Sequence, residues 1–175
     1  KYNNTLLNQI QKPWYIDNPN VFFNRMLHHQ IYLYAWNKLI RRSLLMEYVI
    51  RFIDGILYED QAWSYELFSH ISSVLLLPQV TYVYENNPSS IVNTTFSLEK
   101  ADKTIWSYTV SCNRMMDNPP HADRYSKNLT VDYLLFMINF MMNGVDLMLK
   151  MPISPSIANG FRATKFRILK KSLCY

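Results

Sequence analysis

One stretch in the middle of the chain constrains the fold most strongly, because it fixes where a buried helix begins. Two adjacent acids, Glu59 and Asp60, stand where an extended apolar run ends. Large apolar side chains then recur three and four positions apart, which places them on one face of an α-helix. They are Trp63, Leu67, Phe68 and Ile71. The pattern predicts a helix from Glu59 to about Ser72 whose inner face belongs to the core.

The acidic first turn makes these two residues candidates for chemistry as well. Carboxylates at a helix N-terminus face the positive end of the helix dipole, which favours their ionised, proton-accepting form. That position suits a general base, with Asp60 as the proton acceptor and Glu59 as a supporting acid. Acidic first turns are also common in purely structural helices, so the pattern alone leaves both interpretations open.

Two further blocks flank this junction, one on each side. In chain order the three blocks are Trp36-Asn-Lys38-Leu-Ile-Arg41-Arg42, then Phe52-x-x-Gly55-x-x-x-Glu59-Asp60, then Tyr82-Val-Tyr84 with Ser90-Ile91 behind it. Together they resemble the acceptor-side half of bacterial family 2 glycosyltransferases of the GT-A fold. The resemblance extends over roughly residues 20 to 95, about half of the chain, and rests on the ordered combination of blocks.

The resemblance implies an α/β fold, as a partial GT-A-like domain that is mainly helical with a few short strands. It implies an inverting transfer of a sugar from a nucleotide-sugar donor to a glycan or lipid-linked acceptor in surface polysaccharide synthesis. Asp60 and Glu59 would be the catalytic pair. The substrate-binding set would be Trp36, Lys38, Arg41, Arg42 and Trp63. Cations near the leaving diphosphate would offset negative charge in the transition state, although paired arginines also commonly flank a strand end in solvent.

The nucleotide-binding half of that family has no counterpart here. No two aspartates are separated by one residue, so the metal-holding Asp-x-Asp motif is missing, and three glycines are too few for a phosphate loop. We therefore expect the acceptor-side, C-terminal portion of a transferase, either a separated fragment or a remnant, and inactive alone. The divalent Mg or Mn ion would be held by the absent half, with none bound by this chain alone.

Composition fits a folded protein and excludes a disulfide-rich one. With 175 residues, 49% hydrophobic and 18% charged, the chain is long enough for a real core. Cys112 and Cys174 have neither metal-ligand nor disulfide-framework spacing, so we expect free thiols in a reducing cytoplasm. His28 and His29 point about 100° apart on a helix, so they do not readily share one metal ion.

The remaining patterns divide the chain into four parts. We expect an irregular entry over 1–19, the acceptor-side part over 20–96, a helical region over 97–161 and a basic tail over 162–175. Within them we predict these elements: a helix over 21–30 capped by Asn20, a strand over 31–40, a short helix capped by Ser43, paired strands over 74–77 and 80–84, a helix from Ser97 towards Met116 that ends at Asn118-Pro119-Pro120, an amphipathic helix over 125–150, and breaks at Pro152, Pro155 and Gly160.

The basic tail suggests a different class of function. The formal net charge of +5 lies entirely in residues 162–175, which contain five cations and no acid. Because Phe166, Leu169 and other apolar residues are interleaved with these cations, the tail suits an anionic membrane surface. A solvated helix end explains the charge equally well, and nucleic acid is not favoured because no binding motif accompanies it. The competing reading is a non-enzymatic helical module that binds a partner protein or a membrane. For the enzyme we expect a cytoplasmic location, peripheral at the inner face of the membrane.

Overall fold

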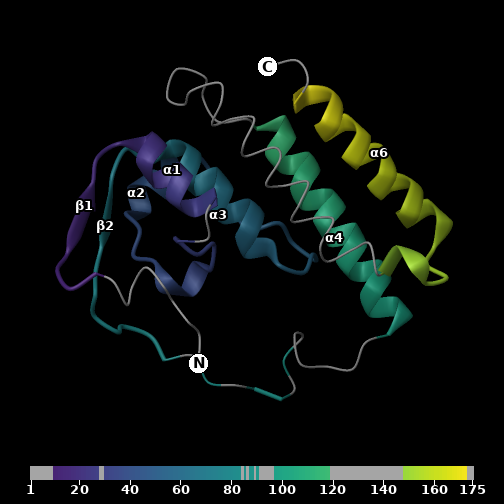
Figure 1. The fold of residues 1–175 in the computed structure, drawn as a ribbon, viewed down its shortest axis with the longest axis horizontal. Coiled ribbons are helices and arrows are strands. Elements are labelled where there is room, and N and C mark those ends of the chain that lie inside the picture. The colour runs from purple at the N-terminus through teal and green to yellow at the C-terminus, as the bar shows by residue number, and fades with distance from the viewer. Residues whose placement is uncertain are drawn as a thin grey trace.

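Helices make up most of the described structure, and its strands are short (Figure 1). The computed structural model describes residues 10–27, 30–83, 85, 87, 88, 90, 97–118 and 148–172. The elements are β1 (Trp14–Ile16), α1 (Pro19–Leu27), the 3-10 helix η1 (Ala35–Asn37), α2 (Arg42–Glu47), α3 (Glu59–His70), β2 (Val74–Leu76), α4 (Leu98–Asp117), the 3-10 helix η2 (Met148–Lys150) and α6 (Pro155–Ser172). The expected mainly helical fold with a few short strands is confirmed.

The two strands pair with each other, which the sequence did not indicate. β1 and β2 are antiparallel, with Trp14 opposite Leu76 and Ile16 opposite Val74. The predicted pairing of 74–77 with 80–84 is wrong, since the described residues 80–83 form no strand. The segment 74–77 is entirely apolar and was therefore expected to be buried, but Leu75 is 55% exposed. Only one face of this two-stranded ribbon is covered by the rest of the protein, so alternate side chains face solvent.

Helix α1 begins two residues earlier than predicted, with a different cap. The Oδ1 atom of Asn18 accepts hydrogen bonds from the backbone N–H groups of Asn20 and Val21, at 3.0 and 3.4 Å. Asn18 therefore caps the helix, and Asn20 lies in its first turn. The predicted buried face is confirmed at Phe22 and Phe23.

The stretch over 31–40 is a loop that contains η1, so the predicted strand is wrong. Aromatic and branched residues favour a strand, but no neighbouring strand pairs with this segment in the described part of the chain. Instead the side chain of Lys38 binds carbonyl groups of its own loop and curls it. Helix α2 follows with Arg41 at its N-cap, so Ser43 lies inside the helix and is not the cap.

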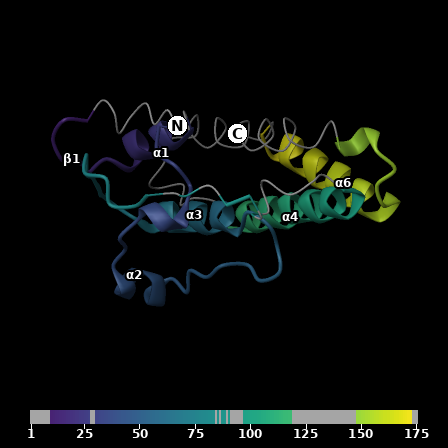
Figure 2. The same cartoon turned by 90° about the horizontal axis from the view of Figure 1, so that it is seen from below.

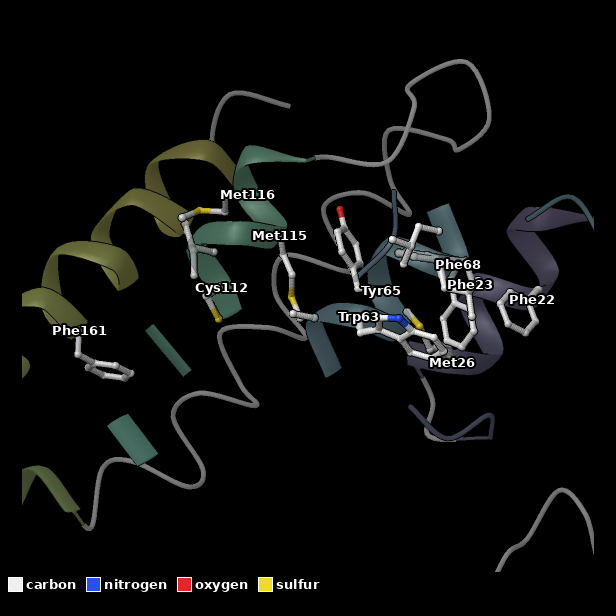
Figure 3. Close-up of a cluster of buried hydrophobic side chains, with 14 of the residues drawn as sticks. Phe22, Phe23, Met26, Trp63, Tyr65, Phe68, Cys112, Met115, Met116 and Phe161 are labelled. Carbon is white, nitrogen blue, oxygen red and sulfur yellow. The ribbon is translucent and has the colours of Figure 1, made fainter. Parts of the chain in front are cut away.

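Helix α3 is the centre of the packing, as its apolar spacing predicted. Figure 3 shows side chains of α1, α3, α4 and α6 gathered in the buried clusters. The rings of Phe22 and Phe68 meet edge to face at 4.7 Å, which joins α1 to α3. On the other side the guanidinium of Arg114 lies 3.0 Å from the carboxylate of the buried Glu66, which joins α3 to α4. Figure 2 shows α3 and α4 in one row, with α6 beside α4.

Helix α4 has the predicted start and end. The hydroxyl of Ser97 accepts a hydrogen bond from the Lys100 N–H at 3.1 Å, so Ser97 is the N-cap. The helix ends at Asp117, just before the predicted break over 118–120.

Helix α6 overturns the breaks predicted at Pro155 and Gly160, because both residues lie within it. Proline is tolerated in a first helical turn, where its missing N–H would have no helical partner. The helix runs parallel to α4, since Asp102 accepts a hydrogen bond from the Ser154 N–H while Asp117 pairs with Arg167. Most of the predicted basic tail is therefore a packed helix.

Several predicted features lie outside the described residues. They are the histidines at 28 and 29, the greater part of the helix over 125–150, and Cys174. Among the helices of the described part, none is long and apolar enough to cross a membrane.

The packing of α6 can be tested by one pair of substitutions on that helix. Ile168 is fully buried whereas Phe166 is 69% exposed. Ile168→Ala should lower the free energy of unfolding by about 2 to 5 kcal/mol, as expected for a large side chain removed from a core. Phe166→Ala should lower it by less than about 1 kcal/mol. Urea unfolding followed by circular dichroism measures both, and equal losses would show that α6 is not packed as described.

Candidate functional site

The junction before α3 is a tight turn that fixes the position of the two acids. Gly55 and Tyr58 both have left-handed backbone conformations, with φ of 78° and 58°. Between them, the Leu57 N–H donates a hydrogen bond of 2.9 Å to the hydroxyl of the buried Ser107 on α4. Glycine adopts this conformation readily, whereas tyrosine does so at a cost that the surrounding contacts must offset. The start of α3 is thus held against α4.

Asp60 is half-buried and lies against the loop that precedes α2. The backbone N–H of Ala35 donates to its carboxylate, and the Lys38 ammonium attracts it. The pKa of Asp60 is nevertheless raised above its ordinary value, first by burial and then by the neighbouring charge of Glu59. The expectation that the helix terminus would favour the ionised form is therefore corrected: loss of solvent outweighs the favourable contacts. Glu59 itself is exposed.

A raised pKa does not remove Asp60 from acid–base chemistry. A carboxylate is a stronger proton acceptor when its pKa moves towards neutrality, provided that it remains ionised at the working pH. Half-burial also leaves part of the side chain accessible to a ligand. Asp60 thus has the properties of a general base, while the exposed Glu59 acts on it through charge.

Lys38 lies at the site but is engaged by its own loop. Its Nζ atom donates to the carbonyl of Tyr32 and to Oδ1 of Asn37, both at 2.7 Å, and to the carbonyl of Tyr34. An ammonium group has three N–H donors, so these three oxygens use all of them. Burial lowers the pKa of Lys38 to about 7, an effect that Asp60 opposes. The arrangement suits a residue that shapes the loop more than one that binds a diphosphate.

Trp36 belongs to an aromatic stack that the sequence did not predict. The ring of Trp36 stacks on that of Tyr34 at 5.1 Å and on that of Tyr82 at 4.7 Å. Tyr32 extends the stack beyond Tyr34, at 5.5 Å. The aromatics at alternate positions 32, 34 and 36 were the available signal, because an extended segment places such residues on one side.

The other predicted substrate-binding residues are spread apart. Trp63 is 6% exposed and packs in the core, with its ring stacked on that of Phe52 at 4.8 Å. Arg41 and Arg42 are exposed at the start of α2. The structure therefore brings together Asp60, Lys38 and the loop that carries Trp36, and it gives Trp63 a packing position.

Two more tyrosines lie near the acids, Tyr58 just before α3 and Tyr108 on α4. The rings of Tyr58 and Tyr108 stack at 5.5 Å. Burial raises the pKa of Tyr108, and the nearby Tyr58, Cys112 and Asp60 add to the shift. Tyr108 therefore stays protonated and neutral beside Asp60 across the physiological range. Sequence analysis did not single out this residue, because nothing in its spacing marks the approach of α4 to the junction.

The described residues include no group of three or more acids, histidines or cysteines that could hold a metal ion. Cys112 is a buried free thiol, as expected, and burial raises its pKa to about 12. It is therefore protonated and a poor nucleophile at neutral pH.

The lowered pKa of Lys38 predicts a pH dependence of stability. Between about pH 7 and pH 10.5 the folded state holds fewer protons on this residue than the unfolded chain does, so the free energy of unfolding should rise with pH across that window. Lys38→Met removes the titrating group and should flatten the rise. Urea unfolding at pH 7 and pH 9.5 compares the two proteins. Lys12→Met, which removes an exposed lysine, should behave as the wild type does. An unchanged slope in Lys38→Met would refute the buried, weakly basic state of Lys38.

Comparison of the chain with models of known protein families, with curated proteins and with solved structures finds no match.

Proposed function

We propose that this chain is the acceptor-side portion of an inverting, family 2-like glycosyltransferase, in which Asp60 is the catalytic base. One observation carries the proposal: the three sequence blocks meet in space. Ala35, which immediately precedes the first block, donates its N–H to Asp60 of the second. Tyr82 of the third block stacks on Trp36 of the first. Distant segments that converge on a half-buried carboxylate are an arrangement typical of an active site.

In this proposal Asp60 accepts the proton of the acceptor hydroxyl as that oxygen attacks the donor sugar. The Ala35 N–H and the Lys38 ammonium orient the carboxylate, and partial burial keeps it basic. Glu59 raises the proton affinity of Asp60 through its charge. The resemblance assigns the divalent Mg or Mn ion to the nucleotide-binding half, and no step here is routed through it.

The alternative, a helical module at a membrane surface, has one observation in its favour. The outer side of α6 exposes Phe166 and Leu169 together with Arg162 and Lys170. An apolar and basic helix face of this kind suits weak, salt-sensitive contact with anionic lipid. The two ideas are compatible, because an enzyme that extends lipid-linked glycans works beside a membrane. In that case the location would be cytoplasmic and peripheral.

The proposal is tested by removing the proton acceptor in the cell that makes the protein. Asp60→Asn keeps the side-chain shape and can still accept the Ala35 N–H. Extracts are supplied with nucleotide sugars and Mg or Mn, and sugar transfer to the endogenous acceptor is measured. Transfer should fall by roughly 100- to 10,000-fold, the range typical of general-base loss. Asp54→Asn changes an exposed acid nearby and should transfer at the wild-type rate.

Two results would contradict the proposal. Wild-type transfer by Asp60→Asn would exclude Asp60 as the base. Unchanged transfer and unchanged surface glycan after deletion of the whole gene would exclude the transferase function itself.

A further inference from the structure

The aromatic stack ends in a ring that has an unused face. Trp36 stacks on both Tyr34 and Tyr82, although it remains 43% exposed. Tyr82 has Trp36 on one side only, and among the described residues no other ring contacts it. The residue is 50% exposed. Tyr82 is therefore the more exposed end of the stack, because Tyr32 at the other end is partly buried.

The surroundings of this ring are apolar and exposed. Val80 and Val83, on the segment that carries Tyr82, are 84% and 75% exposed. Large apolar side chains that remain in solvent beside a stacked ring mark a surface that a ligand covers.

The stack is also adjacent to the proposed base. Ala35, whose N–H binds Asp60, stands between Tyr34 and Trp36 in the chain. The same short segment therefore holds the carboxylate and carries two rings of the stack. An acceptor with more than one sugar ring offers one ring to Tyr82 and another to the carboxylate.

Charge at the stack decides between a sugar and a nucleobase. A nucleotide stacked here would need a cation for its phosphates. Lys38 is the cation that the structure places at the stack, and its three N–H donors are bound to loop oxygens. A neutral sugar ring has no such requirement. One face of a hexopyranose carries several C–H bonds, whose slightly positive hydrogens suit the negative face of a phenol ring.

We propose that the outer face of Tyr82 is a carbohydrate subsite that stacks on the apolar face of a hexopyranose in an acceptor of two or more sugars. This inference rests on the proposed function for its assignment to the acceptor, but the binding can be measured without any transfer reaction. Tyr82 is in this account a substrate-binding residue, and Trp36 supports it from behind.

The test is saturation-transfer-difference NMR on the full chain with lactose and cellobiose as probes, and with uridine monophosphate as the nucleotide arm. Saturation should reach the C–H protons of one sugar face most strongly. Tyr82→Ala should weaken disaccharide binding by about 2- to 10-fold, the range expected for loss of one aromatic contact. Tyr82→Phe should bind as the wild type does, because the face is kept. Tyr15→Ala removes another exposed tyrosine, on β1, and should have no effect.

Three outcomes would contradict the proposed subsite. These are disaccharide binding that survives Tyr82→Ala, absence of saturation transfer to both disaccharides, and Tyr82-dependent binding of uridine monophosphate in their place. The proposed function fails separately, through the Asp60→Asn transfer assay. Sugar binding lost in Tyr82→Ala, with transfer intact in Asp60→Asn, would keep the subsite and reject the base.

Discussion

The contact between the Asp60 carboxylate and the loop over 32–38 is the interaction on which the site depends. It joins the first turn of α3 to a segment that has no regular pairing of its own in the described part of the chain. The hydroxyl of Ser64, one turn further along α3, donates to the carbonyl of Leu33 and holds the same loop from below. Two polar groups of one helix thus fix the loop that presents the aromatic stack. Loss of either contact would weaken the hold of α3 on this loop.

The helices behind the site supply the rigidity that this contact needs. Glu66 lies on α3 between the site and the core, and its pairing with Arg114 ties α3 to α4. Because Glu66 is buried, loss of Arg114 would leave an uncompensated charge in a region of low polarity, which is costly. Further along, Asn113 donates to Thr164, so α4 is tied to α6 in turn. The proposed catalytic residue, Asp60, lies at the N-terminal end of α3, at one end of these packed helices.

Sequence patterns predicted the parts of the fold that depend on local rules. The apolar spacing after Asp60 located α3, and the helix predicted from Ser97 is α4, which Ser97 caps. Sequence patterns failed where contacts between distant segments determine the structure. β1 and β2 are three residues each and lie far apart in the chain, so no periodicity could reveal that they pair. The loop over 31–40 has strand-like composition, but Lys38 folds it on itself.

The same limit applies to the candidate site. The acids could be located from sequence, but the raised pKa of Asp60 comes chiefly from its burial by distant segments, which local rules do not describe. Tyr82 was read as part of a strand, and its stacking on Trp36 depends on two segments that meet only in three dimensions. The resemblance selected Asp60 and Trp63 alike, and the structure distinguishes a half-buried Asp60 from a core-packed Trp63.

The central claim is that Asp60 is a half-buried carboxylate held by the Ala35 N–H, with a raised proton affinity. The most direct measurement is an NMR pH titration that follows the Asp60 carboxyl carbon and the Ala35 amide proton together. Both signals should titrate with one midpoint, above the 3.8 of an exposed aspartate. A midpoint at or below that value, or an Ala35 amide that does not respond, would contradict the raised pKa of Asp60 and its contact with Ala35.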